Sequence, residues 1–84
     1  MYYIYLLKSE NKDFIYVGYT KDLKKRLSDH NKGSVRATRK HKPLNLVYYE
    51  AYISKKDALE RERKLKHYGS SIGHLKKRII YSLS

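Results

Sequence analysis

The chain has no cysteine, no long hydrophobic run and few acidic residues. Without cysteine it has no disulfide framework, no zinc ribbon and no thiol nucleophile. The longest apolar run, Tyr2 to Leu7, is too short to cross a bilayer or to form the core of a signal peptide. We therefore expect a soluble, cytoplasmic protein without a membrane partner.

Basic residues outnumber acidic ones by 20 to 8, which gives a formal net charge of +12. The excess lies in two blocks: residues 20–43 carry a net +7, and residues 63–84 carry a net +6 with no acid at all. Lys and Arg near phosphates release condensed counterions, so this pattern favours a polyanionic partner. A basic protein that is merely solvated is the alternative. An anionic membrane surface is disfavoured, because neither block carries the wide apolar face of an interfacial helix.

Two strands are predicted at the start of the chain, over Tyr2 to Lys8 and Phe14 to Tyr19, where β-branched and aromatic residues gather. The polar residues 9–13 between them suit a hairpin connection. Alternation places Tyr5 and Tyr16 on one face, beside a glycine that leaves space, Gly18.

The remaining elements follow from caps and periodicity. Thr20 is expected to cap a helix from Lys21 to about Lys32, with Gly33 as its stop, followed by a basic loop over residues 34–42. A third strand is expected over residues 45–53. Further helices are predicted from the capping box at Ser54 to about residue 68, ended by Gly69, and over residues 71–83. The order ββαβαα, with no repeat or linker, indicates one α+β domain over residues 1–84.

Three polar side chains stand out by position. Arg26 and His30 are four residues apart and share a helix face. Glu62 falls within the apolar face of the second helix, where a carboxylate is costly unless it meets a cation, a metal or solvent. Two interpretations remain open for Glu62: an ion pair with a residue such as Arg61 or Lys66, or a ligand to a divalent ion.

These residues resemble the GIY-YIG nuclease domain when they are taken together. Tyr3-Ile4-Tyr5 is followed after ten residues by Tyr16-Val17-Gly18, and then by Arg26, His30 and the helical Glu62. The resemblance covers nearly the whole chain, and includes the RLxxHNxG stretch and the ALERE segment that ends at Glu62. A similar module forms the nuclease half of the excision-repair incision subunit and also occurs in homing endonucleases.

The resemblance implies a fold and a set of roles. The fold is a small three-stranded antiparallel sheet flanked by helices. Tyr5 and Tyr16 match the tyrosines of the two motifs, Arg26 the helical arginine, and His30 the histidine one turn later. Glu62 matches the glutamate that holds a single Mg²⁺ or Mn²⁺, which favours the metal-ligand interpretation of this residue.

The function that follows is metal-dependent hydrolysis of phosphodiester bonds in nicked, branched or irregular DNA, with DNA favoured over RNA. Either Tyr5 or Tyr16 would take the proton from water, its phenolate favoured by Arg26 and a metal, with His30 assisting that transfer or orienting the phosphate. The expected nucleic-acid contacts are Lys24, Lys25, Arg36, Arg39, Lys40 and Lys42. We expect no attached DNA-binding domain, so a targeting or repair protein is a further expected partner.

Two departures from the family pattern keep an alternative open. Tyr3 stands where the first motif has glycine, and residues 63–84 contain no asparagine, which many active members place after the metal glutamate. The alternative is a nucleic-acid-binding module with weak or lost catalysis, or an accessory factor of a repair complex.

Overall fold

A computed structural model describes the whole chain, residues 1–84. Its elements in chain order are β1 (Tyr2–Ser9), β2 (Ile15–Thr20), α1 (Leu23–Asn31), β3 (Leu44–Tyr52), α2 (Lys55–His67), α3 (Gly69–Arg78) and α4 (Ile80–Leu83). The predicted order ββαβαα is confirmed, and a one-turn helix follows it. No helix of the chain is long and apolar enough to span a membrane.

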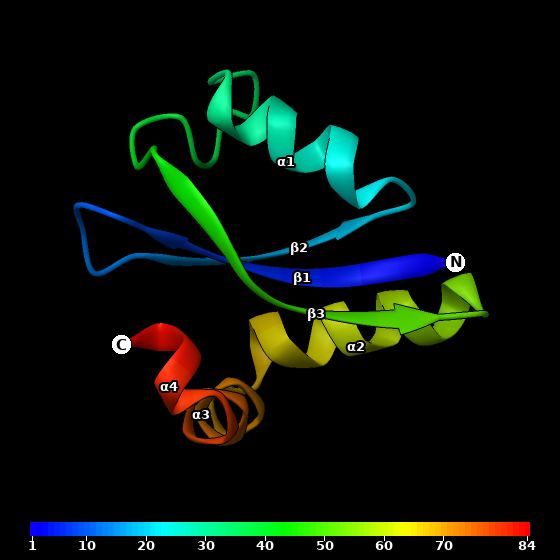
Figure 1. Cartoon of the computed structure of the whole chain (residues 1–84). Helices are drawn as coiled ribbons and strands as arrows, with labels where there is room; N and C mark the ends of the chain where they lie inside the picture. Colours follow the sequence, from blue (N-terminus) through cyan, green and yellow to red (C-terminus); the bar gives the residue numbers. More distant parts are fainter.

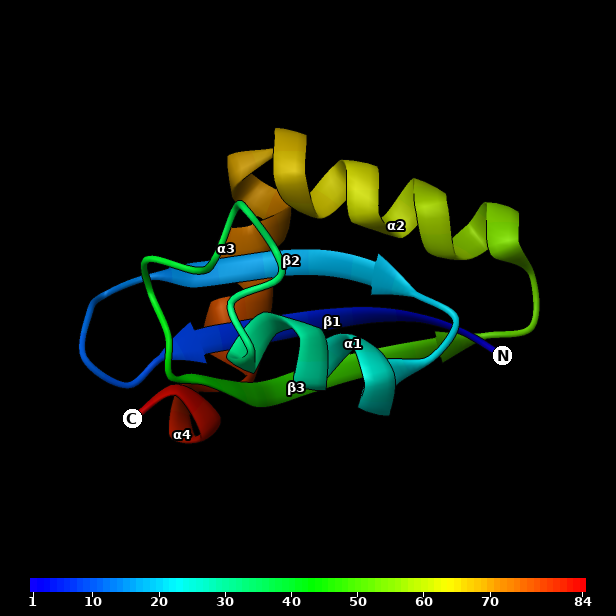
Figure 2. The same ribbon diagram turned by 90° about the horizontal axis from the view of Figure 1, so that it is seen from above.

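The three strands form one antiparallel sheet in the order β2-β1-β3, so β1 lies in the centre. Helix α1 covers one face of this sheet, and α2 and α3 cover the other (Figure 1). Seen from above, α2 runs alongside the β2 edge, while α1 crosses over the other two strands (Figure 2). The predicted α+β fold with a three-stranded antiparallel sheet is therefore confirmed.

Each sheet face has its own apolar cluster, as the strand alternation predicts. The α2–α3 side buries the larger one: Ile4, Leu6, Val17, Ala58, Leu65 and Leu75. The α1 side buries Tyr5, Leu7 and Leu44, against which Leu23 and Leu27 of α1 pack. A nine-residue helix is marginal by itself, so α1 depends on these contacts and on its caps.

The start of α1 differs from the prediction. Asp22, not Thr20, is the N-cap, and its carboxylate accepts a hydrogen bond from the Lys25 backbone N–H at 3.1 Å. The Thr20 hydroxyl instead accepts from the Asp22 backbone N–H at 3.1 Å and closes the turn that precedes the helix. Both residue types cap helices, and the sequence alone does not choose between two candidates this close together. Gly33 follows the helix with a positive φ of 79°, which confirms it as the stop.

The C-terminal helices also differ from the prediction. Ser54 is confirmed as the N-cap of α2, since the Asp57 backbone N–H donates to Ser54 Oγ; the reciprocal bond of a capping box, from the Ser54 backbone N–H to the Asp57 carboxylate, is absent. However, Gly69 begins α3 instead of ending α2, because the extended residue Tyr68 separates the two helices. The last predicted helix is split at Ile79: beyond the break Ile80 is 57% exposed, whereas Leu83 is half-buried.

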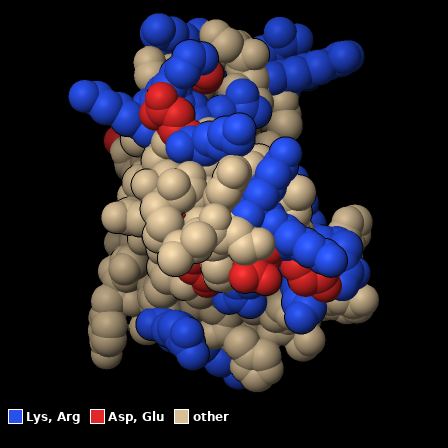
Figure 3. Space-filling model, turned by 90° about the vertical axis from the view of Figure 1, so that its right-hand side faces the viewer, with Lys and Arg blue, Asp and Glu red and all other residues tan.

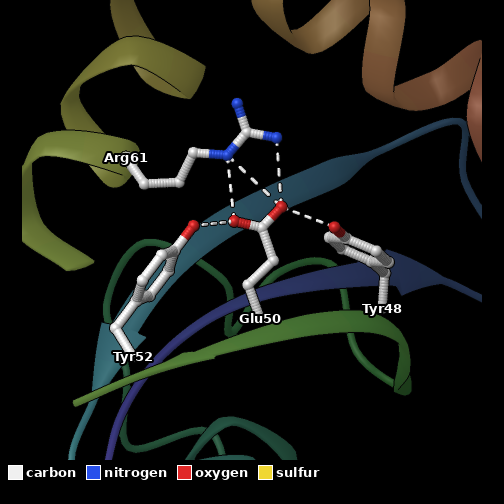
Figure 4. A network of polar contacts seen from close by, with 4 residues as sticks. All are labelled: Tyr48, Glu50, Tyr52 and Arg61. Atoms are coloured by element: carbon white, nitrogen blue, oxygen red, sulfur yellow. Dashed lines mark hydrogen bonds and ion pairs between the residues drawn. The ribbon is translucent and has the colours of Figure 1, made fainter. Parts of the chain in front are cut away.

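A buried acid–base network fastens α2 to β3. Glu50 of β3 accepts hydrogen bonds from Arg61 Nε at 2.9 Å and Nη2 at 3.0 Å, and from the hydroxyls of Tyr48 and Tyr52 (Figure 4). Burial alone would raise the pKa of Glu50, but the hydrogen bonds from Arg61 and the tyrosines outweigh it and lower that pKa below its ordinary value. The carboxylate is thus charged and fully satisfied, and Arg61 is not available to Glu62.

We predict that Glu50→Gln lowers the free energy of unfolding by about 1–3 kcal/mol, because it leaves the half-buried Arg61 without its counter-ion. Glu60→Gln is the matched control, since Glu60 forms an exposed ion pair with Arg63 on the same helix and its loss is expected to have no measurable effect. Urea denaturation measures both variants. Equal stabilities for the two would contradict a fastening role for Glu50.

Candidate active site

Tyr5 lies at the centre of the site, on the middle strand of the sheet. Its side chain is only 2% exposed, and the residue opposite it in register on β2 is Gly18. A Cβ atom on Gly18 would lie 2.8 Å from Tyr5 Cε1 and closer still to Cζ and the hydroxyl oxygen. The phenol ring therefore lies directly over the glycine, in space that any other residue would fill.

His30 continues from Tyr5 toward α1. Its imidazole is fully buried, with Nε2 at 2.8 Å from the Tyr5 hydroxyl and Nδ1 at 2.6 Å from the Thr38 hydroxyl. Thr38 is also fully buried, although it belongs to the loop between α1 and β3. A hydrogen-bonded chain thus links the central strand, α1 and the loop. We call Tyr5, His30 and Thr38 the relay.

Burial keeps the relay uncharged. Desolvation, with a smaller effect of the Arg26 charge, lowers the pKa of His30 below its ordinary value. Burial also raises the pKa of Tyr5 to about 12; Arg26 acts in the opposite direction but is outweighed. Arg26 thus favours the phenolate as expected, yet Tyr5 is a neutral phenol here. The two contacts fit either neutral tautomer of His30; in the one that leaves Nε2 as an acceptor, Tyr5 donates to Nε2 and Nδ1–H donates to Thr38.

Arg26 and Tyr16 flank the relay. Arg26 lies one helical turn before His30, and its interaction with the Tyr5 hydroxyl raises the pKa of the guanidinium. It forms no ion pair within 4.0 Å of an acid, so its charge is free for an anion. The Tyr16 ring is half-buried, with its centroid 5.2 Å from that of His30 and 6.3 Å from that of Tyr5.

Glu62 approaches the same place from α2, on the other side of the sheet. Its carboxylate is 3.1 Å from Lys66 Nζ, and that ammonium lies 5.5 Å from the centroid of the Tyr16 ring. The negative charge of Glu62 also helps to raise the pKa of Tyr5, which places the two groups within electrostatic reach. The side chain is 21% exposed, so the predicted apolar position lies at the open border of the core.

The donor set fits a hard cation with few protein ligands. Nowhere in the chain do three or more His, Cys, Asp or Glu side chains cluster to enclose a metal. Mg²⁺ is commonly held by one or two carboxylates together with water and phosphate oxygens, and Glu62 offers one accessible carboxylate. Its partner Lys66 is 39% exposed and is free to swing aside. The predicted metal residue thus suits Mg²⁺ or Mn²⁺ and does not suit a fully enclosed structural ion.

The predicted nucleic-acid contacts are all exposed: Lys24 and Lys25 on α1, and Arg36, Arg39, Lys40 and Lys42 on the loop that follows. Lys25 pairs with Asp29 at 3.5 Å, a weak exposed contact. Figure 3 shows Lys and Arg side chains, with Asp and Glu among them, at the top of the molecule, where α1 lies, and again lower down near α2, with mostly uncharged surface between the two groups on the left. A bound polyanion would bring its phosphates to the α1 side of the site.

This chain belongs to the GIY-YIG family, since the model of the GIY-YIG catalytic domain matches residues 1–77. The family consists of endonucleases that generally use divalent metal ions, and the domain has a nuclease-type fold. The resemblance drawn from the two tyrosine motifs is therefore confirmed.

The chain is similar to several UPF0213 proteins. It is 39% identical to that of Bacillus pumilus over 66 residues, which are 77% of this chain and 66% of the relative. It is 46% identical to that of Streptococcus pyogenes over 61 residues, 71% of this chain and 65% of the relative. The chain thus spans slightly less than two thirds of the length of these relatives. The solution NMR structure of the Bacillus halodurans UPF0213 protein is 32% identical, with a TM-score of 0.54 over all of this chain and 86% of that one.

One residue of the site was not among the predicted ones: Thr38, which orients His30. Thr38 lies in a segment without apolar periodicity, so the sequence gives no sign that it is buried. It becomes buried because the loop between α1 and β3 folds back beside α1. Lys66 was expected as a possible ion-pair partner of Glu62, and the structure confirms that pair. The spacing of Glu62 and Lys66, one helical turn apart, was the available signal for an ion pair.

We predict that Gly18→Ala displaces the Tyr5 ring and lowers the free energy of unfolding by about 1–3 kcal/mol through overpacking. Gly73→Ala is the matched control: its new methyl group meets nothing within 4 Å and lies within α3, so this variant is expected to gain stability. Thermal denaturation and the chemical shifts of the Tyr5 ring report both effects. An unmoved ring in Gly18→Ala would show that the close approach is not a constraint.

The buried, neutral His30 predicts a pH dependence of stability. Because its pKa is lowered in the folded protein, the unfolded chain binds the proton more readily, and stability falls as the pH drops below about 6.5. His30→Gln should therefore show a smaller loss of unfolding free energy between pH 7.5 and 5.5 than the parent protein. His74→Gln, at an exposed position, should keep the parental loss. An unchanged slope in His30→Gln would contradict this.

Proposed function

We propose that this protein is a metal-dependent endonuclease that hydrolyses phosphodiester bonds in DNA, preferably at nicked, branched or irregular structures. The observation that carries the proposal is the meeting of three kinds of group at one place: the neutral relay, the unpaired cation Arg26 and the carboxylate of Glu62. Hydrolysis of a phosphodiester needs a proton acceptor for water, which the relay would supply, and stabilisation of phosphate charge, which Arg26 would supply. It also needs a Lewis acid, which a metal ion on Glu62 would supply.

The relay supplies the proton acceptor. As water attacks phosphorus, the Tyr5 oxygen takes a proton from the water while the Tyr5 proton passes to His30 Nε2. The bond from phosphorus to the leaving sugar oxygen breaks, and that oxygen takes up a proton from solvent water. The imidazolium that forms keeps its Nδ1–H hydrogen bond to Thr38. This transfer needs no free phenolate, which matters because burial raises the pKa of Tyr5 to about 12. The contact with His30 favours Tyr5 over Tyr16 as the base.

Arg26 and Tyr16 would hold the phosphate. A guanidinium forks onto two non-bridging oxygens, and its interaction strengthens as their negative charge grows. Glu62 would hold the divalent ion, which when bound supplies Lewis-acid stabilisation of the phosphate charge and lowers the pKa of water. The half-buried Tyr16, whose ring lies beside those of Tyr5 and His30, would orient the phosphate. Any targeting or repair protein that guides the domain would bind outside this site.

A binding role without catalysis has one observation in its favour. Tyr3 and Tyr49 form an edge-to-face pair with centroids 5.9 Å apart, and Tyr49 is 53% exposed. Lys21 and Lys24 line the adjoining hollow of 360 Å³. Exposed tyrosines beside lysines suit the stacking of unpaired bases. In a nuclease the same pair would hold a single-stranded segment of an irregular substrate.

Cleavage of labelled plasmid, fork, flap and single-stranded DNA in Mg²⁺ or Mn²⁺ tests the proposal. We predict that Glu62→Gln loses cleavage by about a hundredfold or more while binding remains similar or becomes slightly tighter, since a negative charge near phosphate is removed. Arg26→Ala should weaken both. Glu60→Gln, two residues away on α2 and exposed, is the matched control and should cleave normally.

The outcomes separate the two roles. Nicks that require both the metal and Glu62 support the endonuclease. Salt-sensitive binding without cleavage of any substrate would leave the binding module in its place, and nicking that survives in Glu62→Gln would remove the assigned role of this carboxylate.

A further inference from the structure

The C-terminal basic block has no part in the site described above, apart from Lys66. Residues 63–84 carry six Lys and Arg and no acid. Part of this block gathers around a hollow of 340 Å³ between α2 and α3, whose lining is Arg61, Ser71, His74, Leu75 and Arg78. No carboxylate lines it.

The spacing on α3 explains how these side chains meet. Ser71, His74 and Arg78 recur at three and four residues, so they share one helix face. Leu75, between them, is 3% exposed and packs into the larger apolar cluster. That anchor fixes the rotation of α3 and directs its three polar neighbours to the border of the core, toward α2.

Arg61 is held in place by the network with Glu50. Two of its nitrogens, Nε and Nη2, are taken up by the carboxylate, which also accepts hydroxyl hydrogen bonds from Tyr48 and Tyr52. Figure 4 shows the remaining nitrogen without a partner, pointing away from Glu50. A guanidinium fixed in this manner presents its outer N–H groups with little further loss of conformational entropy.

Arg78 adds a charge that nothing neutralises. It is exposed and forms no ion pair within 4.0 Å. The Ser71 hydroxyl has no hydrogen-bond partner in the protein, and His74 is exposed beside it. Two guanidinium groups, a hydroxyl and an imidazole around a hollow without acids are the donors that a phosphate group accepts.

We propose that this hollow is a second phosphate-binding site, and that it holds a backbone phosphate of the nucleic acid outside the cleavage site. Arg61 contacts Glu50 of β3, and Leu75 packs in the apolar cluster on the α2–α3 side of the sheet, whereas Tyr5 and Tyr16 belong to the cluster on the α1 side. A substrate with two arms meets both sites, whereas a short single arm meets one. The phosphate site stands by itself; only the assignment of its phosphate to DNA rests on the proposed function.

Amide chemical shifts of the ¹⁵N-labelled protein test this, with inorganic phosphate as one probe and a short forked DNA as the other. We expect saturable shifts at residues 71–78 with both probes, lost in Arg78→Gln and kept in Lys77→Gln. Lys77 is the matched control, because it loses the same charge from the same helix yet does not line the hollow. Arg78→Gln should bind the forked DNA about threefold more weakly than Lys77→Gln does. Its binding should also depend less on salt: the slope of the logarithm of the binding constant against the logarithm of the salt concentration should fall by about one.

Each result is decisive. Shifts with phosphate but not with DNA would keep the site and overturn its assignment to the backbone, in favour of a free phosphate compound. No saturable shift with either probe, or equal behaviour of Arg78→Gln and Lys77→Gln, would overturn the site. Because no readout depends on cleavage, a protein that shows these shifts without nicking DNA would refute the proposed nuclease and leave the phosphate site intact.

Discussion

The absence of a side chain at Gly18 is the constraint on which the site depends. Only a glycine opposite Tyr5 lets the phenol ring lie across β2 and reach His30. His30 in turn fixes the face of α1 that turns toward the sheet, and so places Arg26 one turn away. Its second nitrogen holds Thr38 and with it the loop that returns to β3. One missing methyl group thus positions the central strand, a helix and a loop around a single hydrogen-bonded chain.

The site combines an uncharged interior with charges at its border. Tyr5, His30 and Thr38 are almost fully buried, which keeps phenol and imidazole neutral and hydrogen-bonded to each other. Arg26 and Lys66 lie at the rim and are available to anions. Charge that develops on a phosphate at this border would meet a fixed guanidinium on one side and an exchangeable Glu62–Lys66 pair on the other. This division matches what phosphodiester hydrolysis requires: proton transfer within the relay and charge stabilisation outside it.

Much of the fold was predictable, because period-two alternation in the strands and the Ser54 N-cap are local signals. Tyr5, Tyr16 and Gly18 were placed on one face by alternation alone, and the structure confirms it. The predictions that were wrong depended on a choice between two candidate residues or on tertiary contacts. Asp22 and Thr20 are equivalent caps in sequence, and the break at Ile79 has no proline or glycine to announce it. Thr38 becomes buried only once the loop and α1 have packed on the sheet. The same packing buries Tyr5, and this burial raises the pKa of Tyr5 by more than Arg26 lowers it.

Glu62 is proposed to hold a divalent ion beside the relay, and paramagnetic broadening by Mn²⁺ tests this role most directly. Trace Mn²⁺ added to the ¹⁵N-labelled protein should broaden the amide signals around Glu62 together with those of Tyr5 and Tyr16, and Glu62→Gln should abolish both effects. Broadening centred elsewhere, for example on the exposed acids at the start of α2, or broadening that persists in Glu62→Gln, would contradict the account.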